Sequence, residues 1–373
     1  MSRVYFYLLN QDKNVLTFQT NTDVPTDTFA PFLISANLAT WEFVDGTKFI
    51  DNNTLNISAR TGLPSVPTSL GDNELNGVAQ DVKVSIVGDD FSTITDMELS
   101  NDNIINTFDA SKLTGMDDFR INSNPGLTKI INPSSSTPIT NYYVYLCGLV
   151  GNLDVSMMQL GGTFQAYNNP LLTSITNPIS SEVFSNYRVQ LCGLEGELDV
   201  SGLTGLGGFF YAYSNGSLTS VKNPTSNELI TRYRVYGCNI TGVLNVSGLT
   251  RLSGEFRADG NSLLTGVTFP PSDEVFNKIY IYNCDSGYID FTVMTNCMDL
   301  NNSDVRLEDN LMTTAEVNQI LVDIDSITDG LYTGRSIDIS GNNAAPDGSS
   351  GGFDGDAAIV SLATKNITVT ATL

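Results

Sequence analysis

Apolar and polar residues alternate over short segments that recur about every 23 residues along most of the chain. In each segment, two apolar or aromatic residues flank one polar or tyrosine residue, and the segments begin at residues 97, 119, 142, 164, 187, 210, 233, 256, 279, 305 and 337. An alternation of period two predicts a β-strand with one buried face. We therefore predict eleven adjacent parallel strands whose first and third residues are buried.

An alternating series of asparagine and cysteine follows these strands, three residues after each. Its members are Asp102, Asn124, Cys147, Asn169, Cys192, Asn215, Cys238, Asn261, Cys284, Asn310 and Asn342. A period of 20–29 residues is typical of a solenoid, and the cysteine spacing of 45, 46 and 46 makes the repeating unit a pair of coils.

The stacking distance decides the state of the cysteines. Coils stack about 4.8 Å apart, so cysteines two coils apart are about 10 Å apart, beyond the ~7 Å that a disulfide spans between Cα atoms. We predict that the four cysteines of the series are buried, unbridged and without metal. Cys297 lies outside the series and has no predicted role.

The strand followed by asparagine resembles the LxLxxN pattern of the leucine-rich repeat family over residues 82–345, with cysteine replacing asparagine in alternate coils. The resemblance implies one strand per coil and a buried asparagine that binds turn backbone. The segments SSEVF, SNELI and SDEVF are candidates for single helical turns. LDVSGL predicts strand-like structure on the opposite wall.

The flanks depart from the repeat. We divide the chain into a β-rich N-terminal domain at 1–80, a leucine-rich-repeat-like solenoid of about eleven coils at 81–345, and a C-terminal cap at 346–373. The fold class is thus mainly β with short helical turns. TWEFVDGTKF (residues 40–49) resembles PKD-like β-sandwich modules, although Val44 stands where glycine is expected.

Near the C-terminus, four apolar residues have helical spacing and predict a helix that packs over the solenoid end: Val317, Ile320, Leu321 and Ile324. A final coil, a Gly/Asp loop, a helical turn and a terminal strand should follow. The loop acids Asp347, Asp354 and Asp356 are conceivable Ca²⁺ ligands, but they lack the spacing of known calcium loops. We expect solvated acids.

Composition narrows the function. The 373 residues include 18 Lys and Arg against 41 Asp and Glu, for a net charge of −23, which argues against binding nucleic acid or an anionic membrane. The absence of histidine excludes every histidine-dependent triad, general base and zinc site. No apolar run reaches transmembrane length, and the opening residues are too polar for a signal peptide. We expect no cofactor and no metal.

The polar sides of the predicted strands form one exposed sheet face with two positions per coil. Tyr and Arg occupy 13 of these 22 positions, and both residue types are enriched in binding hot spots. We predict a nearly neutral ligand-binding face made of Tyr143, Tyr145, Tyr167, Arg188, Tyr211, Tyr213, Arg234, Tyr236, Arg257, Tyr280 and Tyr282. The alternative is that Arg–Tyr ladders simply stabilise the sheet.

No catalytic constellation is visible. A glycosidase needs two opposed carboxylates, and Asp259, Glu308 and Asp338 are the only nearby candidates on the face. Asp259 and Glu308 are predicted two coils apart. We therefore expect a protein that is not an enzyme.

Three functions remain: a bacteriophage virion protein, a bacterial surface adhesin, or an intracellular interaction scaffold. The composition suits an extracellular environment, yet no export signal or anchor is apparent, and a virion protein exposed after host lysis reconciles the two. IDISGNNAAPDG and the ending NITVTAT resemble leucine-rich repeat proteins of phages that infect Bacteroidetes-type hosts. The expected partners are other virion proteins through residues 1–80 and a host-surface glycan or protein through the sheet face.

Overall fold

A computed structural model describes residues 94–101, 104–135 and 137–373, together with the backbone of five earlier strands. These strands are β1 (Asn14–Thr20), β2 (Phe32–Ser35), β3 (Ala39–Phe43), β4 (Lys48–Asp51) and β5 (Val82–Gly88). The chain forms two compact units, residues 1–160 and 161–373. The predicted domain boundaries at 80 and 345 stay predictions.

In the first unit, the N-terminal strands extend both walls of the earliest coils. β1 pairs antiparallel with β5 and with β7 (Ile104–Asp109), and β9 (Leu127–Ile131) continues that wall in parallel. β2 pairs antiparallel with β6 (Ile94–Glu98), which is followed in parallel by β8 (Asp118–Arg120) and β10 (Ile139–Tyr143). β11 (Gly151–Asp154) closes the unit. The PKD-like stretch includes β3 and the start of β4, and its residues 44–47 lie outside the described residues.

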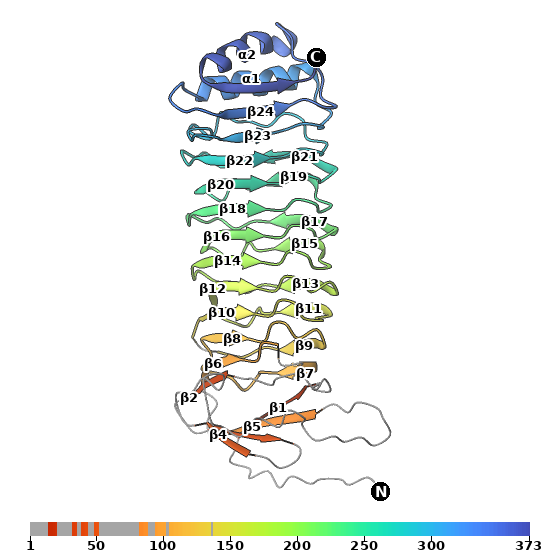
Figure 1. The fold of residues 1–373 in the computed structure, drawn as a ribbon, viewed down its shortest axis with the longest axis vertical. Coiled ribbons are helices and arrows are strands. Elements are labelled where there is room, and N and C mark those ends of the chain that lie inside the picture. Colours follow the sequence, from red (N-terminus) through yellow and green to blue (C-terminus); the bar gives the residue numbers. More distant parts are fainter. Residues whose placement is uncertain are drawn as a thin grey trace. The chain divides into compact units, whose positions relative to one another are not determined.

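In the second unit, one wall is a single parallel sheet (Figure 1). Its strands are β12 (Leu160–Gln165), β14 (Phe184–Arg188), β16 (Leu206–Tyr211), β18 (Ile230–Arg234), β20 (Leu252–Arg257), β22 (Phe276–Tyr280), β23 (Asp304–Arg306), β24 (Arg335–Ile339) and β25 (Ile367–Ala371).

The opposite wall consists of shorter parallel pairs. It contains β13 (Leu172–Thr176), β15 (Glu195–Asp199), β17 (Ser217–Lys222), β19 (Thr241–Asn245) and β21 (Leu263–Thr268), with β15 paired to β17 and β19 to β21. β15 ends on the LD of LDVSGL and β19 ends on the corresponding LN, so the predicted strand-like structure on the second wall is confirmed. The coils of both units thus form parallel β-solenoid structure with one sheet strand per repeat of about 23 residues, and the first unit adds the antiparallel N-terminal strands.

The predicted alternation is confirmed in every coil. Each of the eleven segments lies in or directly at the end of a sheet strand, and all 22 residues predicted to be buried are at most 1% exposed. A column of stacked rings fills the core of the second unit, with centroid distances of 4.9–5.6 Å: Phe164, Tyr187, Phe210, Tyr233 and Phe256.

The tyrosines of this column carry a hydroxyl into the core, and an asparagine ten residues earlier in the chain supplies the acceptor. Tyr187 donates to Asn177 at 2.9 Å and Tyr233 donates to Asn223 at 3.1 Å. Two coils after Tyr233 the strand carries Ile279, and the position that corresponds to Asn223 is Phe269. At this position, asparagine is present in the coils where a buried tyrosine hydroxyl needs an acceptor, and an apolar residue replaces it in the coil whose strand carries isoleucine in place of tyrosine.

The buried asparagines bind turn backbone, as the resemblance implied. Asn215 is fully buried, donates to Val189 and Ala212 carbonyls, and accepts from the Cys192 and Leu194 amides. The last member of the series is Asn343 and not Asn342 as predicted, because this turn has one more residue between the strand and the bonding asparagine: Asn343 donates to the carbonyl four residues earlier, whereas Asn310 donates to the one three residues earlier. Asp102 lies outside the described residues.

All five cysteines fall in the described part of the chain and are free thiols, as predicted for those of the series. The S–H groups of the four cysteines in the series donate to carbonyls of the preceding coil, for example Cys192 to Ala166 at 3.2 Å and Cys238 to Ala212 at 3.3 Å. Cys238 is half-buried, whereas the prediction was full burial. Cys297 is buried in the core.

The three segments considered as helical turns are extended. Ser180, Ser226 and Ser272 form isolated parallel bridges to the next coil, and the chain then runs directly into a sheet strand. Their hydroxyls accept from the amide two residues later, as with Ser180 and Glu182 at 3.2 Å. A serine at this position suggested the start of a helix. Its hydrogen bond to the nearby amide instead fixes the corner of a coil.

The C-terminal region contains the predicted helix as α1 (Thr314–Ile327), which begins with a capping box between Thr313 and Glu316. Its four predicted core residues are buried. α2 (Gly355–Thr364) is longer than the helical turn expected there, and β25 is the terminal strand. Both helices lie at the C-terminal end of the second unit (Figure 1).

Candidate functional site

The strands β14, β16, β18, β20 and β22 present three rows of outward side chains, which we call the sheet face. Strand register aligns the first row as Asn186, Phe209, Arg232, Glu255 and Lys278, and the second as Arg188, Tyr211, Arg234, Arg257 and Tyr280. The third row follows the strand ends: Gln190, Tyr213, Tyr236, Asp259 and Tyr282.

Sequence reasoning found the second and third rows and missed the first. A β-bulge interrupts the alternation before each first-row residue, as between Phe184 and Asn186 in β14. Two outward residues in succession hide the period there. The signal that marks the first row is the buried apolar residue two positions earlier, such as Ile230 before Arg232.

Most predicted site residues meet on this face. The nine from Tyr167 to Tyr282 lie in the second unit, with Tyr167 just beyond β12, whereas Tyr143 and Tyr145 belong to the first unit at the end of β10. The face is less exposed than predicted: all of these side chains are half-buried except Tyr211, which is only 5% exposed. They are partly covered because they pack against one another.

Arginine and tyrosine stack alternately along the rows. Arg257 lies 4.0 Å from the ring centre of Tyr236, while Arg188 and Arg234 lie 5.2 and 4.8 Å from that of Tyr211. The rings of Tyr213 and Tyr236 stack at 4.5 Å and 7°. Cation–π contacts of this kind are worth about 0.5–2 kcal/mol each. The face is therefore preorganised, and its ladder also stabilises the sheet.

The acidic residues of the face are engaged by arginines. Glu255 binds Arg234 at 2.6 Å, and Asp259 binds Arg257 through two bonds of 2.8 and 2.9 Å. The hydrogen bonds that Arg257 donates to Asp259 raise the pKa of Arg257.

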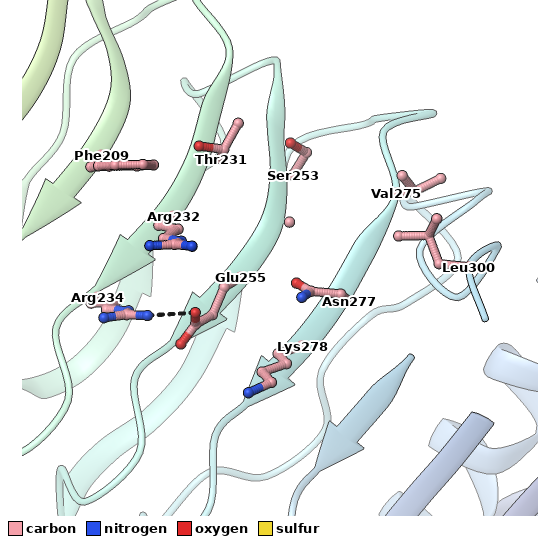
Figure 2. Close-up of a pocket in the computed structure, with 11 residues that line it drawn as sticks. Phe209, Thr231, Arg232, Arg234, Ser253, Glu255, Val275, Asn277, Lys278 and Leu300 are labelled. Carbon is pink, nitrogen blue, oxygen red and sulfur yellow. Dashed lines mark hydrogen bonds and ion pairs between the residues drawn. The ribbon is translucent and has the colours of Figure 1, made fainter. Parts of the chain in front are cut away.

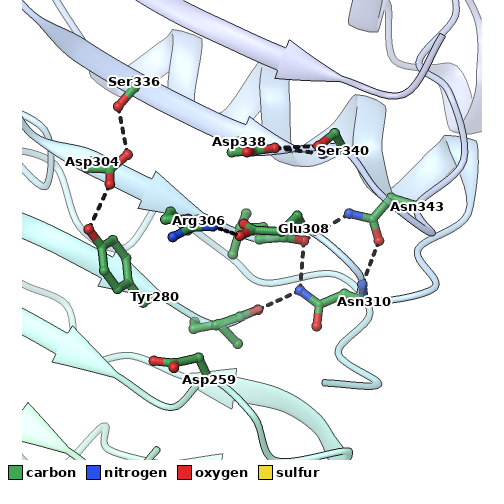
Figure 3. A network of polar contacts seen from close by, with 12 residues as sticks. Asp259, Tyr280, Asp304, Arg306, Glu308, Asn310, Ser336, Asp338, Ser340 and Asn343 are labelled. Atoms are coloured by element: carbon green, nitrogen blue, oxygen red, sulfur yellow. Dashed lines mark hydrogen bonds and ion pairs between the residues drawn. The ribbon is translucent and has the colours of Figure 1, made fainter. Parts of the chain in front are cut away.

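The same arrangement continues into β23 and β24, where Arg306 binds Glu308 and Asp338 accepts from Ser340 (Figure 3). Burial raises the pKa of Glu308. The three acids considered for glycosidase chemistry thus each have a local partner, and none faces another across a cleft.

Three cations of the face are different. Within the described side chains, Arg188, Arg232 and Lys278 form no ion pair. The face carries five basic and two acidic side chains, a local charge of +3 in a chain of net charge −23. We predicted a nearly neutral face. The second and third rows contribute +2 of this charge, from three arginines and Asp259, and the first row adds +1, from two cations and Glu255.

A pocket of about 760 Å³ opens on the face beside the first row. Figure 2 shows Arg232 and Lys278 on either side of Glu255, with the Arg234–Glu255 ion pair beside them. Thr231, Ser253 and Asn277 add uncharged polar groups to its wall, and Phe209 closes one end. The pocket is suited to binding a polar anion.

The loop acids near the C-terminus have structural roles. Asp347 accepts from Asn318 and from the backbone amides of Ser349 and Ser350 and the Ser350 hydroxyl at 2.6–3.0 Å, and these bonds hold its pKa well below the usual range. Asp354 caps α2 by accepting from Ala357 at 2.9 Å. We predicted solvated acids, and Asp354 and Asp356 are exposed while Asp347 is half-buried. Asp347 and Asp354 also hold the loop and the helix start through these bonds.

The fold and the face together define a β-solenoid repeat protein with a cationic, tyrosine-lined sheet face. Comparison with protein-family models, curated proteins and solved structures gave no match. No helix in the described part of the chain is long and apolar enough to cross a membrane.

Proposed function

We propose that this protein is a non-enzymatic recognition protein whose sheet face binds a ligand on a host cell. The observation that carries the proposal is the local charge of +3 on the face of a chain with net charge −23. Cations gathered at one place without acidic partners repel one another, which costs free energy. A bound anion removes that cost.

The rigidity of the face supports binding over a purely structural role. Stacked Tyr and Arg side chains lose little conformational entropy when a ligand arrives. The five strands span about 20 Å across the stack, a width suited to a typical recognition surface. The Arg–Tyr ladder stabilises the sheet, but stabilisation does not require Arg232 and Lys278 to lack acidic partners.

For the biological setting, we propose a leucine-rich-repeat-like component of a bacteriophage virion. The period of about 23 residues and the buried asparagines that bind turn backbone support the family resemblance. A virion protein of this kind attaches to the particle through residues 1–80 and meets the host surface through the sheet face.

Cell adsorption tests the recognition role. Purified fluorescent protein is titrated onto candidate host cells, with the double variant Tyr213→Ser/Tyr236→Ser as the test. These two rings stack on each other, so their joint removal leaves neither ring without its partner. The matched control is Val243→Ser on β19 of the opposite wall, where Val243 is 59% exposed.

We expect at least tenfold weaker adsorption for the double variant and no change for the control, with both showing the circular dichroism spectrum of the unmodified protein. Unchanged adsorption by the folded double variant contradicts a recognition role for the face. Mass spectrometry of purified particles tests the virion assignment separately.

A further inference from the structure

We infer that the sheet face binds a saccharide carrying carboxylates, through one subsite formed by Arg188 and Arg232 and a second formed by Lys278. This inference rests on the recognition role proposed above and names the class of ligand. It is drawn from the three cations that lack acidic partners and from their positions on the strands.

The first subsite is centred on Phe209. The guanidinium carbon of Arg188 lies 5.6 Å from the centre of this ring and that of Arg232 lies 4.9 Å from it. Two guanidinium groups thus flank one ring without a carboxylate bound to either within the described side chains. Arg188 also has a buried Nε–H with no acceptor. Such a donor is costly to bury unpaired, and a carboxylate supplies two acceptors in the geometry that arginine prefers.

The second subsite is two strands further along the stack. In the register of the sheet, Arg232 faces Glu255, and Glu255 faces Lys278. Arg232 and Lys278 are therefore about 10 Å apart at the backbone, which is close to the length of an extended disaccharide. Glu255 lies between them, but Arg234 binds its carboxylate at 2.6 Å.

The surroundings favour a saccharide among anionic ligands. Thr231, Ser253 and Asn277 offer uncharged donors and acceptors on the wall of the same pocket, which suits sugar hydroxyls. Nucleic acid needs a continuous track of phosphate-binding cations and is repelled by the net charge of −23. An acidic peptide cannot add a strand here, because both edges of each central strand are already paired.

An array of carboxylated oligosaccharides, each printed beside its carboxyl-reduced counterpart, tests the inference. The variants are Arg188→Gln/Arg232→Gln and Lys278→Gln. The control is Lys222→Gln, which removes one positive charge from an exposed ion pair on the opposite wall. We expect at least one carboxylated saccharide to bind ten times or more tightly than its reduced form. We also expect the double variant to lose at least tenfold of that affinity and the control to keep it.

Ligand length separates the two subsites. Lys278→Gln should weaken binding of a tetrasaccharide with several carboxylates about tenfold and leave binding of a monosaccharide acid unchanged. Equal binding of acidic and reduced saccharides, no binding to the array, or equal loss in all three variants overturns the inference. Poly-glutamate that competes as well as the saccharide also overturns it, in favour of an acidic peptide.

The two proposals fail differently. If Tyr213→Ser/Tyr236→Ser abolishes cell adsorption but carboxyl reduction does not affect binding, the recognition face stands and the acidic saccharide is wrong. If the folded tyrosine variant adsorbs normally, the recognition face itself is wrong.

Discussion

Replacing Asn215 by alanine tests how the coils are held together. The side chain is fully buried in a turn of the second unit and makes four bonds to backbone. Its amide donates to the carbonyls of Val189 and Ala212 at 3.0 and 2.8 Å. Its carbonyl accepts from the amides of Cys192 and Leu194 at 3.1 and 3.3 Å.

The magnitude follows from the groups left behind. In Asn215→Ala, the carbonyl of Ala212 keeps the thiol of Cys238 as a donor. The carbonyl of Val189 and the two amides lose the bonds described above. Each buried unpaired group costs about 1–3 kcal/mol, and entry of water into the space left by the side chain relieves part of this. We expect a loss of about 3–5 kcal/mol in the free energy of unfolding.

The chain supplies its own control in the next coil. In Cys238→Ala, the carbonyl of Ala212 keeps its bond from Asn215, so the variant removes only a weak S–H bond and the packing of one sulfur atom. This should cost about 1 kcal/mol. Urea unfolding followed by far-UV circular dichroism measures both variants, with the slope checked for loss of two-state behaviour. Equal losses for the two variants would refute the view that the asparagine coils carry the turn hydrogen bonds.

Three further predictions concern the core, the thiols and the cap. Phe210→Ala should lower the free energy of unfolding by about 3–5 kcal/mol, measured in urea, because the ring is fully buried between two tyrosines. Burial raises the pKa of Cys192 to about 12 and of Cys238 to about 11. Iodoacetamide at pH 8 should therefore label native protein slowly and half-buried Cys238 first, as mass spectrometry can show. The pKa of Asp347 is lowered in the folded state. Its stabilising effect should therefore be complete above about pH 5 and decline as the pH falls below the pKa of the unfolded carboxyl. Thermal melts of Asp347→Asn should lack this part of the acid dependence.

The repeat in the sequence was sufficient to predict the solenoid. A short alternation that recurs at a fixed interval is satisfied when successive coils stack and every strand buries the same side. The burial of Phe210 and Ala212 follows from this arrangement. The free cysteines followed from the stacking distance alone. The helical spacing of Val317 and Ile324 was likewise enough to predict α1.

Some local sequence patterns are compatible with two conformations, and the tertiary structure determines which of the two forms. A serine that bonds the amide two residues later suits both a helix start and a coil corner, and the bridge from Ser180 to Leu203 selects the corner. The shift from Asn342 to Asn343 depends on one extra residue in the last turn, which a count along the chain does not reveal.

The candidate site shows the same division. Tyrosines and arginines on one wall were predictable, because strand parity fixes which side a residue occupies. The sequence could not predict which charges remain unpaired. Ion pairing depends on neighbours about 23 residues away and on the rotamer of each side chain. Arg234 binds Glu255 on the next strand. Arg257 binds Asp259, which is two residues further along its own coil. Arg232 and Lys278 are left without acidic partners by these choices, and only the three-dimensional arrangement of the side chains determines them.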